Sequence, residues 1–463
     1  MKKRIVLILT LLILIILGLS FARFYMNSLS SEEPTKNLTI NVSNDILKNA
    51  ETFMKFFKAG NIDGIYAMTS NNFKSSVKID VISKQSKDLK KQLGDVKSFE
   101  NLRLVLDSGY KTVLVYTTFE KGTYDVKISF DMDGKYIEGY SLQESTVDGA
   151  NIDTEKYKGE EISFTSGDYE IYGTLILPKN IDEPLPVVIL LQDSGTNDRD
   201  ETIYGLNKPL KDIAEGLANM GIASLRYDKR TYTYGHSFNK EEIINMSIDK
   251  EFTEDLSSAI DYLSSRNEFD KSNIYVLGHG ISGYILPYIY DKELNVKGGI
   301  SLAGTIASSF EDFLKSQYNY LANYDGKVSE DEQAVLDEFN KGYELVKKMK
   351  SGETIKNDLI LGIGQDYWNF FNNYNGIEQW KLINKPTLVL QGERDYELSI
   401  DNFNFYKKAL ESNETFTFKT YKKLSHIFMK GNKKPSPDDY KTQKTVDKKV
   451  IEDIGNWINN KNS

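Results

Sequence analysis

One short stretch in the second half of the chain has the pattern of a catalytic turn. Residues 274–277 form an apolar run typical of a buried strand, and they lead into Gly278-His279-Gly280-Ile281-Ser282-Gly283. A glycine-flanked turn from strand to helix, G-x-S-x-G, holds a serine nucleophile in strained geometry above a sheet. Here the central position is Gly280. The stretch therefore predicts a nucleophile turn that lacks its serine.

Two later loops supply residues that could act as acid and base. The strand-like run at 387–390 is followed by Asp395, and the run at 416–421 is followed by His426. In a catalytic triad the aspartate fixes the imidazole tautomer and stabilises its cation, while the histidine takes a proton from the attacking group. The order nucleophile, acid, histidine is that of the α/β-hydrolases. We expect Asp395 as acid and His426 as base, against the alternatives of a solvated carboxylate and a structural histidine.

Two positions bear on the oxyanion hole that such a site needs. The backbone N–H of Ile281, next to the nucleophile position, can donate to a developing negative charge. Losing one such donor costs about 2.7–4 kcal/mol of transition-state stabilisation. Asp193 follows the apolar run at 187–191. It would bring a carboxylate close to that charge unless its side chain points away.

Ser282 is the candidate for a replacement nucleophile, two residues beyond Gly280. Helical residues two apart face different directions, which favours a role for Ser282 as a small residue in the tight turn. A water molecule activated by His426 and Asp395 is the other route. Removing the nucleophile from a serine hydrolase costs about 10⁶-fold in turnover. Slight residual activity is therefore the most that we expect.

The elements that must position these residues alternate between strands and helices. After a hairpin at 162–177, apolar runs occur at 187–191, 223–226, 274–277, 299–302, 387–390 and 416–421, separated by helical patterns at 210–219, 253–265, 284–290 and 401–410, with a last one at 446–458. Such alternation predicts a doubly wound, mostly parallel sheet covered on both faces.

A long helical and aromatic segment at about 308–380 interrupts this alternation. We expect it to form a helical cap over the carboxyl edge of the sheet, where ligands bind in open α/β folds. Its aromatic residues suit an apolar pocket for an acyl or aryl group, and core packing of the cap explains them equally well. They are Tyr318, Tyr320, Tyr324, Tyr367, Trp368, Phe370, Phe371 and Trp380.

Over roughly residues 157–460 the sequence resembles the EstD-type bacterial esterases, which have a serine aminopeptidase-like hydrolase domain. The matching stretches are 192–200, 207–214, 226–230, 278–283, 391–396 and Ser425-His426. The resemblance implies an α/β-hydrolase fold and activity on carboxylic esters. It also implies that a small glycine, whose backbone helps to build the oxyanion hole, is replaced here by Asp193. The departures at Asp193, Gly280 and Ser282 thus fall within one small site.

The region at 44–146 has a different pattern. Apolar residues recur at helical spacing over 46–57, a second helical stretch covers 80–93, and alternating strands follow at 102–106 and 124–130. Helices followed by an antiparallel meander make a small α+β domain. It resembles the uncharacterised NTF2-like domain found in front of some exported bacterial hydrolases.

The first residues have the pattern of an export signal. Three basic residues precede an apolar run at 5–22, and a polar tether follows at 27–43. The run nearly spans a hydrocarbon core of about 30 Å, so residues 1–26 are either a cleaved signal peptide or an uncleaved signal-anchor. We expect the body outside the cell. It is then held at the cell membrane by this segment, or secreted if the signal is cleaved.

The bulk composition excludes several classes of protein. A chain of 463 residues exceeds one ordinary core, so at least two domains are expected. A net charge of −9, from 58 basic and 67 acidic residues, argues against a nucleic-acid surface. The absence of cysteine removes disulfides, thiolate chemistry and a lipid-modified cysteine, and three histidines leave little for zinc. We expect neither cofactor nor metal.

The sequence therefore predicts an exported α/β-hydrolase of the carboxylic ester hydrolase type that is weak or inactive as an esterase. It is then a ligand-binding pseudoenzyme for a small ester or apolar molecule. The alternative is an active ester hydrolase that uses Ser282 or an activated water. In a third hypothesis the front domain is the functional part and the hydrolase domain is a scaffold.

Overall fold

A computed structural model describes residues 43–462, apart from gaps at 108–109, 132–133, 145–155, 180–183, 205, 236–237, 293–294, 356–358 and 432–433. The expected export signal at 1–26 and almost all of the tether at 27–43 lie outside the described residues. Within the described residues, none of the helices has both the length and the apolar character that a membrane span requires.

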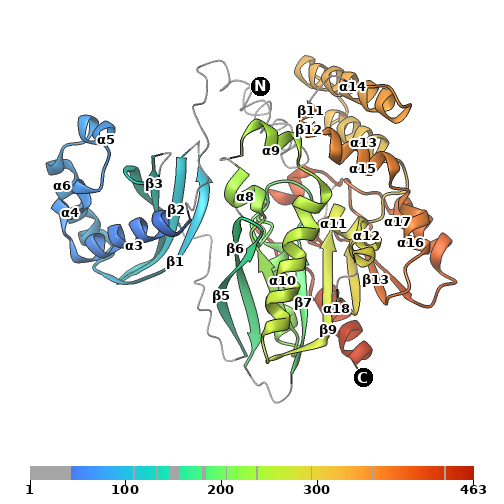
Figure 1. Cartoon of the computed structure of the whole chain (residues 1–463), viewed down its shortest axis with the longest axis horizontal. Helices are drawn as coiled ribbons and strands as arrows, with labels where there is room; N and C mark the ends of the chain where they lie inside the picture. The colour runs from blue at the N-terminus through green and yellow to red at the C-terminus, as the bar shows by residue number, and fades with distance from the viewer. Residues whose placement is uncertain are drawn as a thin grey trace.

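The first part of the described chain is a small α+β domain. Its helices are α3 (Ser43–Ala59), α4 (Ile62–Ala67), α5 (Asn71–Ser76) and α6 (Ile79–Leu93), and its strands are β1 (Val96–Asp107), β2 (Tyr110–Phe119), β3 (Gly122–Phe130) and β4 (Ile137–Glu144). The strands form an antiparallel sheet in the order β1-β2-β3-β4. Helix α3 packs across this sheet (Figure 1), with Phe53 and Met54 buried against Val113 and Val126.

An eight-stranded sheet forms the centre of the larger domain. Its strands are β5 (Tyr157–Ser166), β6 (Tyr169–Pro178), β7 (Leu185–Leu191), β8 (Ala223–Tyr227), β9 (Phe269–His279), β10 (Gly298–Leu302), β13 (Thr387–Gly392) and β14 (Phe416–Tyr421). Their order is β14-β13-β10-β9-β7-β8-β6-β5. The neighbouring strands in β14-β13-β10-β9-β7-β8 all pair in parallel. At the other edge, β6 pairs antiparallel with both β8 and β5.

Helices cover both faces of this sheet, as the strand and helix pattern predicts. Along β7, Val187 and Ile189 belong to one core and Val188 and Leu190 to the other, because successive side chains of a strand point to opposite faces. The first core is shared with α10 (Glu254–Ser265), α11 (Ile281–Tyr284), α12 (Leu286–Asp291) and α17 (Ile400–Leu410). The second is shared with α7 (Pro209–Ala218) and α18 (Lys448–Asn462). Short helices α8 (Arg230–Tyr234) and α9 (Lys240–Ile244) and a π-helical turn (Asp249–Thr253) precede α10.

The long insertion is mainly helical. It contains α13 (Phe310–Asn323), α14 (Glu330–Lys350), the two-stranded β11 (Leu359–Ile360) and β12 (Ile363–Gly364), α15 (Gln365–Asn373) and α16 (Gly376–Lys381). Trp368 and Trp380 are completely buried in the core, and the indole of Trp380 donates to the carbonyl of Tyr284 at 2.9 Å. In Figure 1, α13, α14 and α15 lie together beyond the end of β9 that leads into α11.

The sheet topology determines where the candidate residues meet. Asp193 follows β7, Gly280 follows β9, Asp395 follows β13 and His426 follows β14. These strands belong to the parallel part of the sheet, so their carboxyl ends lie at one edge. Residues that are more than 230 positions apart in sequence therefore lie in one site.

Candidate active site

The turn between β9 and α11 has the geometry that a nucleophile turn requires. Gly280 has φ 55° and ψ −119°, a conformation that glycine adopts without the penalty of a Cβ. Its flanking glycines allow close packing, since a Cβ at Gly278 would overlap the backbone of Ser282 and Gly283. The strand, sharp turn and helix predicted from the sequence are therefore present, and glycine stands at the centre of the turn.

Asp395 and His426 lie together as the acid and base of a triad would. Nδ1 of His426 lies 2.7 Å from Oδ2 of Asp395. The other carboxylate oxygen accepts from the backbone N–H groups of Glu397 and Leu398, each at 2.8 Å, and Gln391 donates to Oδ2 at 2.8 Å. These bonds fix the carboxylate, which makes Nδ1 the donor to Asp395. Nε2 of His426 is left facing the pocket.

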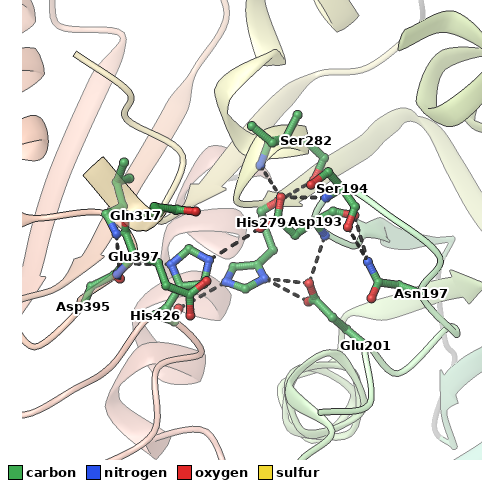
Figure 2. Close-up of polar contacts among 12 residues, drawn as sticks. Asp193, Ser194, Asn197, Glu201, His279, Ser282, Gln317, Asp395, Glu397 and His426 are labelled. Carbon is green, nitrogen blue, oxygen red and sulfur yellow. Dashed lines mark hydrogen bonds and ion pairs between the residues drawn. The ribbon is translucent and has the colours of Figure 1, made fainter. Parts of the chain in front are cut away.

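The carboxyl group of Asp193 occupies the space above Gly280. A Cβ added to Gly280 would overlap Cγ and both carboxyl oxygens of Asp193. Oδ1 accepts from the backbone N–H of Ile281 at 2.7 Å and from that of Ser194 at 2.6 Å. Oδ2 lies 3.6 Å from Nε2 of His426. Figure 2 shows the side chain of Asp193 close to His279, Ser194 and Ser282.

The donors of the oxyanion hole differ in one respect from the expectation. The backbone N–H of Asp193 does not face the pocket, because it donates to Oε1 of Glu201 at 2.9 Å. The N–H of Ser194, one residue later, is directed at the same oxygen as that of Ile281. The N–H groups of Ser194 and Ile281 are therefore the two donors placed as in an oxyanion hole, and a carboxylate oxygen of the protein itself accepts from both.

Buried charges hold the loop that carries Asp193. Lys229 donates to the carbonyl of Asp193 and to Oε1 of Glu251, the latter at 2.8 Å, and both side chains are almost fully buried. Glu251 also accepts from the N–H of Gly195 at 2.8 Å. These bonds fix the backbone on either side of the carboxylate, so the position of Asp193 is built into the loop.

Around this loop lies a larger set of buried ion pairs. Arg199 pairs with Asp228 at 2.7 Å, Arg226 with Asp200 at 2.7 Å, and Arg230 with Asp255 at 2.5 Å. These ion pairs give the charged stretch at 226–230 a structural role.

The charges in the site shift the pKa values of Asp193 and His426 in opposite directions. Burial raises the pKa of Asp193, but His426, His279 and the N–H of Ile281 outweigh it and lower that pKa to about 2. Burial lowers the pKa of His426, but Asp395, Glu397 and Asp193 outweigh it and hold that pKa well above its ordinary value. These charges therefore favour the imidazolium form of His426, whose ring lies between the carboxyl groups of Asp193 and Asp395.

Ser282 lies on the wrong side of the turn for a nucleophile. Its side chain is fully buried and absent from the pocket wall. Its hydroxyl donates to the carbonyl of His279 at 2.9 Å and to that of Leu191 at 3.2 Å. Its hydroxyl thus links β7 to the elbow, in agreement with its interpretation as a small residue of a tight turn.

His279 is a structural neighbour of His426. Nδ1 of His279 lies 2.9 Å from both carboxylate oxygens of Glu201, and Nε2 lies 3.1 Å from the carbonyl of His426. The two rings are 4.5 Å apart. Because both nitrogens are engaged, His279 positions the loop of His426 and has no free nitrogen for chemistry.

A cavity of about 180 Å³ opens above the site. Asp193, Gly280, Ile281 and His426 form its floor. Its walls are largely apolar and come in part from the insertion, which contributes Phe310, Phe313, Leu314, Gln317, Tyr318, Phe339, Leu361 and Tyr367. Of the aromatic residues named from the sequence, Tyr318 and Tyr367 line the cavity, while Trp368, Phe371 and Trp380 are core residues.

Sequence reasoning missed several polar residues of the site. Glu397 and Gln317 line the cavity, and the hydroxyl of Tyr440 donates to Glu397 at 2.7 Å. Burial raises the pKa of Glu397, although His426 opposes this. Glu201 and Glu251 orient Asp193 and its loop. Only their nearness in sequence to predicted site residues could have indicated these glutamates. Glu397 stands two residues after Asp395, and Glu201 directly follows the 192–200 stretch.

Comparisons with known proteins agree with this architecture. Residues 50–138 match the family model described as "Protein of unknown function (DUF3887)". Esterase EstD of Thermotoga maritima is 27% identical over 415 residues, which is 89% of this chain and 95% of EstD. The similarity therefore extends through both domains.

Solved structures of esterase type are also similar. An esterase of Pyrococcus furiosus matches with a TM-score of 0.41 and 14% identity, covering 66% of this chain and 91% of that chain. Est1E of Butyrivibrio proteoclasticus matches with a TM-score of 0.38 and 13% identity, covering 64% and 95%. A putative dienelactone hydrolase of Klebsiella pneumoniae matches with a TM-score of 0.39 and 15% identity, covering 65% and 98%.

The strand order, the turn after β9, the paired Asp395 and His426, and the EstD similarity lead to one assignment. The chain is a homologue of esterase EstD with an α/β-hydrolase fold, which follows a domain that matches DUF3887.

Proposed function

We propose that this protein is an exported hydrolase-fold protein that does not cleave esters through a serine, and that its pocket binds a small, largely apolar molecule. As an esterase of the ordinary kind it is a pseudoenzyme. The observation that carries the proposal is the place of Asp193, whose carboxyl group fills both the space above Gly280 and the oxyanion hole.

The routes that could replace the serine are poorly supported by the geometry. Ser282 is buried and donates to two backbone carbonyls, away from His426. A water molecule would need His426 as base, and Asp193 and Asp395, which both face His426, raise its pKa and so oppose that role. An ester oxyanion would also have to displace Oδ1 of Asp193 from its two N–H donors.

Ligand binding is supported by the form of the cavity. Most of its lining is apolar, and a few polar groups converge at its floor, which is typical of small-molecule sites. The carboxylates of Asp193 and Glu251, which both line the cavity, disfavour an anionic ligand by like-charge repulsion. The pocket therefore fits an uncharged molecule, such as a small ester or a hydrocarbon with one polar group.

The proposal of export rests on the sequence of residues 1–26, with a basic start and an apolar run. We propose that this segment anchors the protein at the outer face of the cell membrane, or directs its secretion if it is cleaved. Protease digestion of intact cells tests this directly. Loss of the hydrolase domain from intact cells, or its presence in the medium, is expected, whereas full protection would contradict export.

A fluorophosphonate probe tests the absence of a serine nucleophile. Intact-mass measurement should show no adduct on the wild-type chain after prolonged incubation, because the probe requires an activated serine. Ser282→Ala is the matched control and should give the same result. An adduct on the wild type that disappears in Ser282→Ala would overturn the proposal.

Binding is measured separately by the thermal shift with small uncharged esters such as phenyl hexanoate. The wild type should be stabilised, because a ligand that binds the folded state raises its melting temperature. Ile243→Trp, on the cavity wall in α9, should abolish the shift by filling the pocket. Equal shifts in both proteins would place binding elsewhere.

A further inference from the structure

We propose that Asp193 is itself a nucleophile, which attacks a saturated carbon of an uncharged alkyl electrophile and forms a covalent ester that His426 and Asp395 then hydrolyse. This deepens the proposed function, since it rests on a pocket that binds a small apolar molecule. It assigns a reaction to a site that lacks a serine.

The first argument is the position of the carboxylate. The two backbone N–H groups hold Oδ1 of Asp193, at 2.7 and 2.6 Å. Oδ2 lies on the side of His426, at the cavity floor. A Cβ and hence a serine at residue 280 would have to occupy the same space. One oxygen is thus anchored and the other stands where a nucleophile is needed, which is the orientation that covalent catalysis by a carboxylate requires.

The second argument concerns the class of substrate. A carboxylate that attacks an ester carbonyl must expel an alkoxide, which is far more basic than the carboxylate, so the addition reverses. At a saturated carbon the leaving group is instead a halide or the oxygen of a strained ring. The apolar cavity wall suits an alkyl chain. The geometry therefore favours a haloalkane or an epoxide over an ester.

In the first step, Oδ2 of Asp193 forms a bond to the alkyl carbon and the leaving group departs with its electron pair. A halide needs no proton. The oxygen of an opened epoxide takes one, and Tyr318 has a suitable donor. Its hydroxyl is buried, Tyr318 lines the cavity, and that hydroxyl has no hydrogen-bond partner among the described residues. Solvent then returns the proton to Tyr318.

The second step explains why a protonated His426 is compatible with catalysis. The ester formed at Asp193 is neutral, so one of the carboxylates that hold the proton on His426 disappears. The pKa of His426 is then set mainly by burial, which lowers it, and by Asp395 and Glu397, which raise it. Loss of this carboxylate therefore lowers the pKa of His426 below that in the resting site, which favours release of its proton to solvent and lets Nε2 act as a base after the first step.

Water then completes the reaction. Nε2 of His426 takes a proton from the water, and the oxygen of the water attacks Cγ of Asp193. The negative charge develops on Oδ1, which already lies between the N–H groups of Ile281 and Ser194. The bond between Asp193 and the alkoxide oxygen breaks, the alcohol leaves with the proton from His426, and the new carboxyl group ionises. The sum is alkyl halide plus water to alcohol, halide and a proton, or epoxide plus water to diol.

The experiment uses 1-bromohexane and 1,2-epoxyhexane, each with the wild type, His426→Ala and Asp193→Asn. In His426→Ala the first step proceeds and the second lacks its base, so intact mass should show one adduct per chain, located at Asp193 by peptide mapping. Asp193→Asn is the matched control and should give no adduct. An adduct with the bromide alone indicates an unassisted leaving group, and one with the epoxide alone indicates proton donation in the pocket.

The wild type gives a second measurement that does not depend on a variant. After a single turnover in H₂¹⁸O, one ¹⁸O should appear in the carboxyl group of Asp193, because water attacks Cγ. Absence of both the adduct and the label with both probes would overturn the inference, and so would an adduct at any residue other than Asp193. If the thermal shift by esters persists in that case, the proposed ligand-binding function still stands. A fluorophosphonate adduct would overturn the proposed function instead.

Discussion

The two halves of the site differ in what they share with a serine esterase. The half after β13 and β14 holds Asp395 and His426 at 2.7 Å, as a triad requires. The half after β7 and β9 holds Gly280 with a carboxylate above it. Both halves lie at the same edge of one parallel sheet. Asp395 and His426 thus keep the arrangement of a triad acid and base, while the group above the nucleophile position comes from a different loop.

The carboxylate of Asp193 also changes the electrostatic surroundings of His426. A serine hydroxyl beside Nε2 is neutral, whereas Asp193 brings a negative charge to 3.6 Å. The pKa of His426 is raised as a result of Asp395, Glu397 and Asp193 together, against burial. His426 and Asp395 keep the positions of a triad base and acid, but here they belong to a cluster of charged groups that includes Asp193.

The largest effect is expected from a double variant that restores the serine of an ordinary esterase site and removes the carboxylate above it. Asp193→Gly with Gly280→Ser removes the carboxylate and supplies a hydroxyl, with Ile281 and Ser194 as oxyanion donors. Hydrolysis of p-nitrophenyl butyrate should rise by several orders of magnitude, up to about 10⁶-fold, and a fluorophosphonate should label the introduced serine.

Gly280→Ser alone is the control for this prediction. It should show no gain, because its Cβ would overlap the carboxyl group of Asp193. Equal activity in the single and double variants would mean that Asp193 does not obstruct the site.

Asp395→Asn, added to that double variant, tests whether Asp395 and His426 can still act as the acid and base of a triad. The amide would hold the imidazole in the wrong tautomer, as in other triads, and kcat should fall by about 10⁴-fold. The pH dependence of the remaining rate provides the check. An unchanged rate would show that the gained hydrolysis does not pass through His426.

A smaller effect concerns the charges that hold the Asp193 loop. Lys229→Met leaves the buried Glu251 without its cation, which should lower the free energy of unfolding by about 3–5 kcal/mol. Lys381→Met removes an exposed pair with Glu378 and should cost at most about 1 kcal/mol. Urea unfolding followed by tryptophan fluorescence measures both, since all three tryptophans lie in the larger domain. Equal losses would argue against a buried charge network behind Asp193.

The sequence predicted the scaffold better than the site. Strands β7, β9, β13 and β14 are short apolar runs, and their periodicity and flanking turns are local properties of the sequence. The alternation of strands and helices then predicts a parallel sheet, with Asp193, Gly280, Asp395 and His426 at its carboxyl edge. Strand β2 of the small domain was not distinguished, because its Val113-Leu114-Val115 run is continuous and lacks the apolar alternation that marked its neighbours.

The direction of side chains was beyond reach of the sequence. Whether Asp193 points into the oxyanion hole or away depends on Glu201, Lys229 and Glu251, which come from separate segments and have no pattern of their own. For the same reason the sequence could not assign the second N–H donor to Ser194. The direction of Ser282 was more accessible, because helical spacing alone predicts that it faces away from Gly280, and its hydroxyl donates to two backbone carbonyls.

The most direct test of this account is an NMR titration of His426 in the wild type and in Asp193→Asn, with the resonance assigned by its loss in His426→Ala. If the carboxylate of Asp193 faces Nε2, His426 stays protonated to a higher pH in the wild type and its pKa falls in Asp193→Asn. The same pKa in both proteins would show that Asp193 does not stand in the place of the missing serine, and would contradict the account.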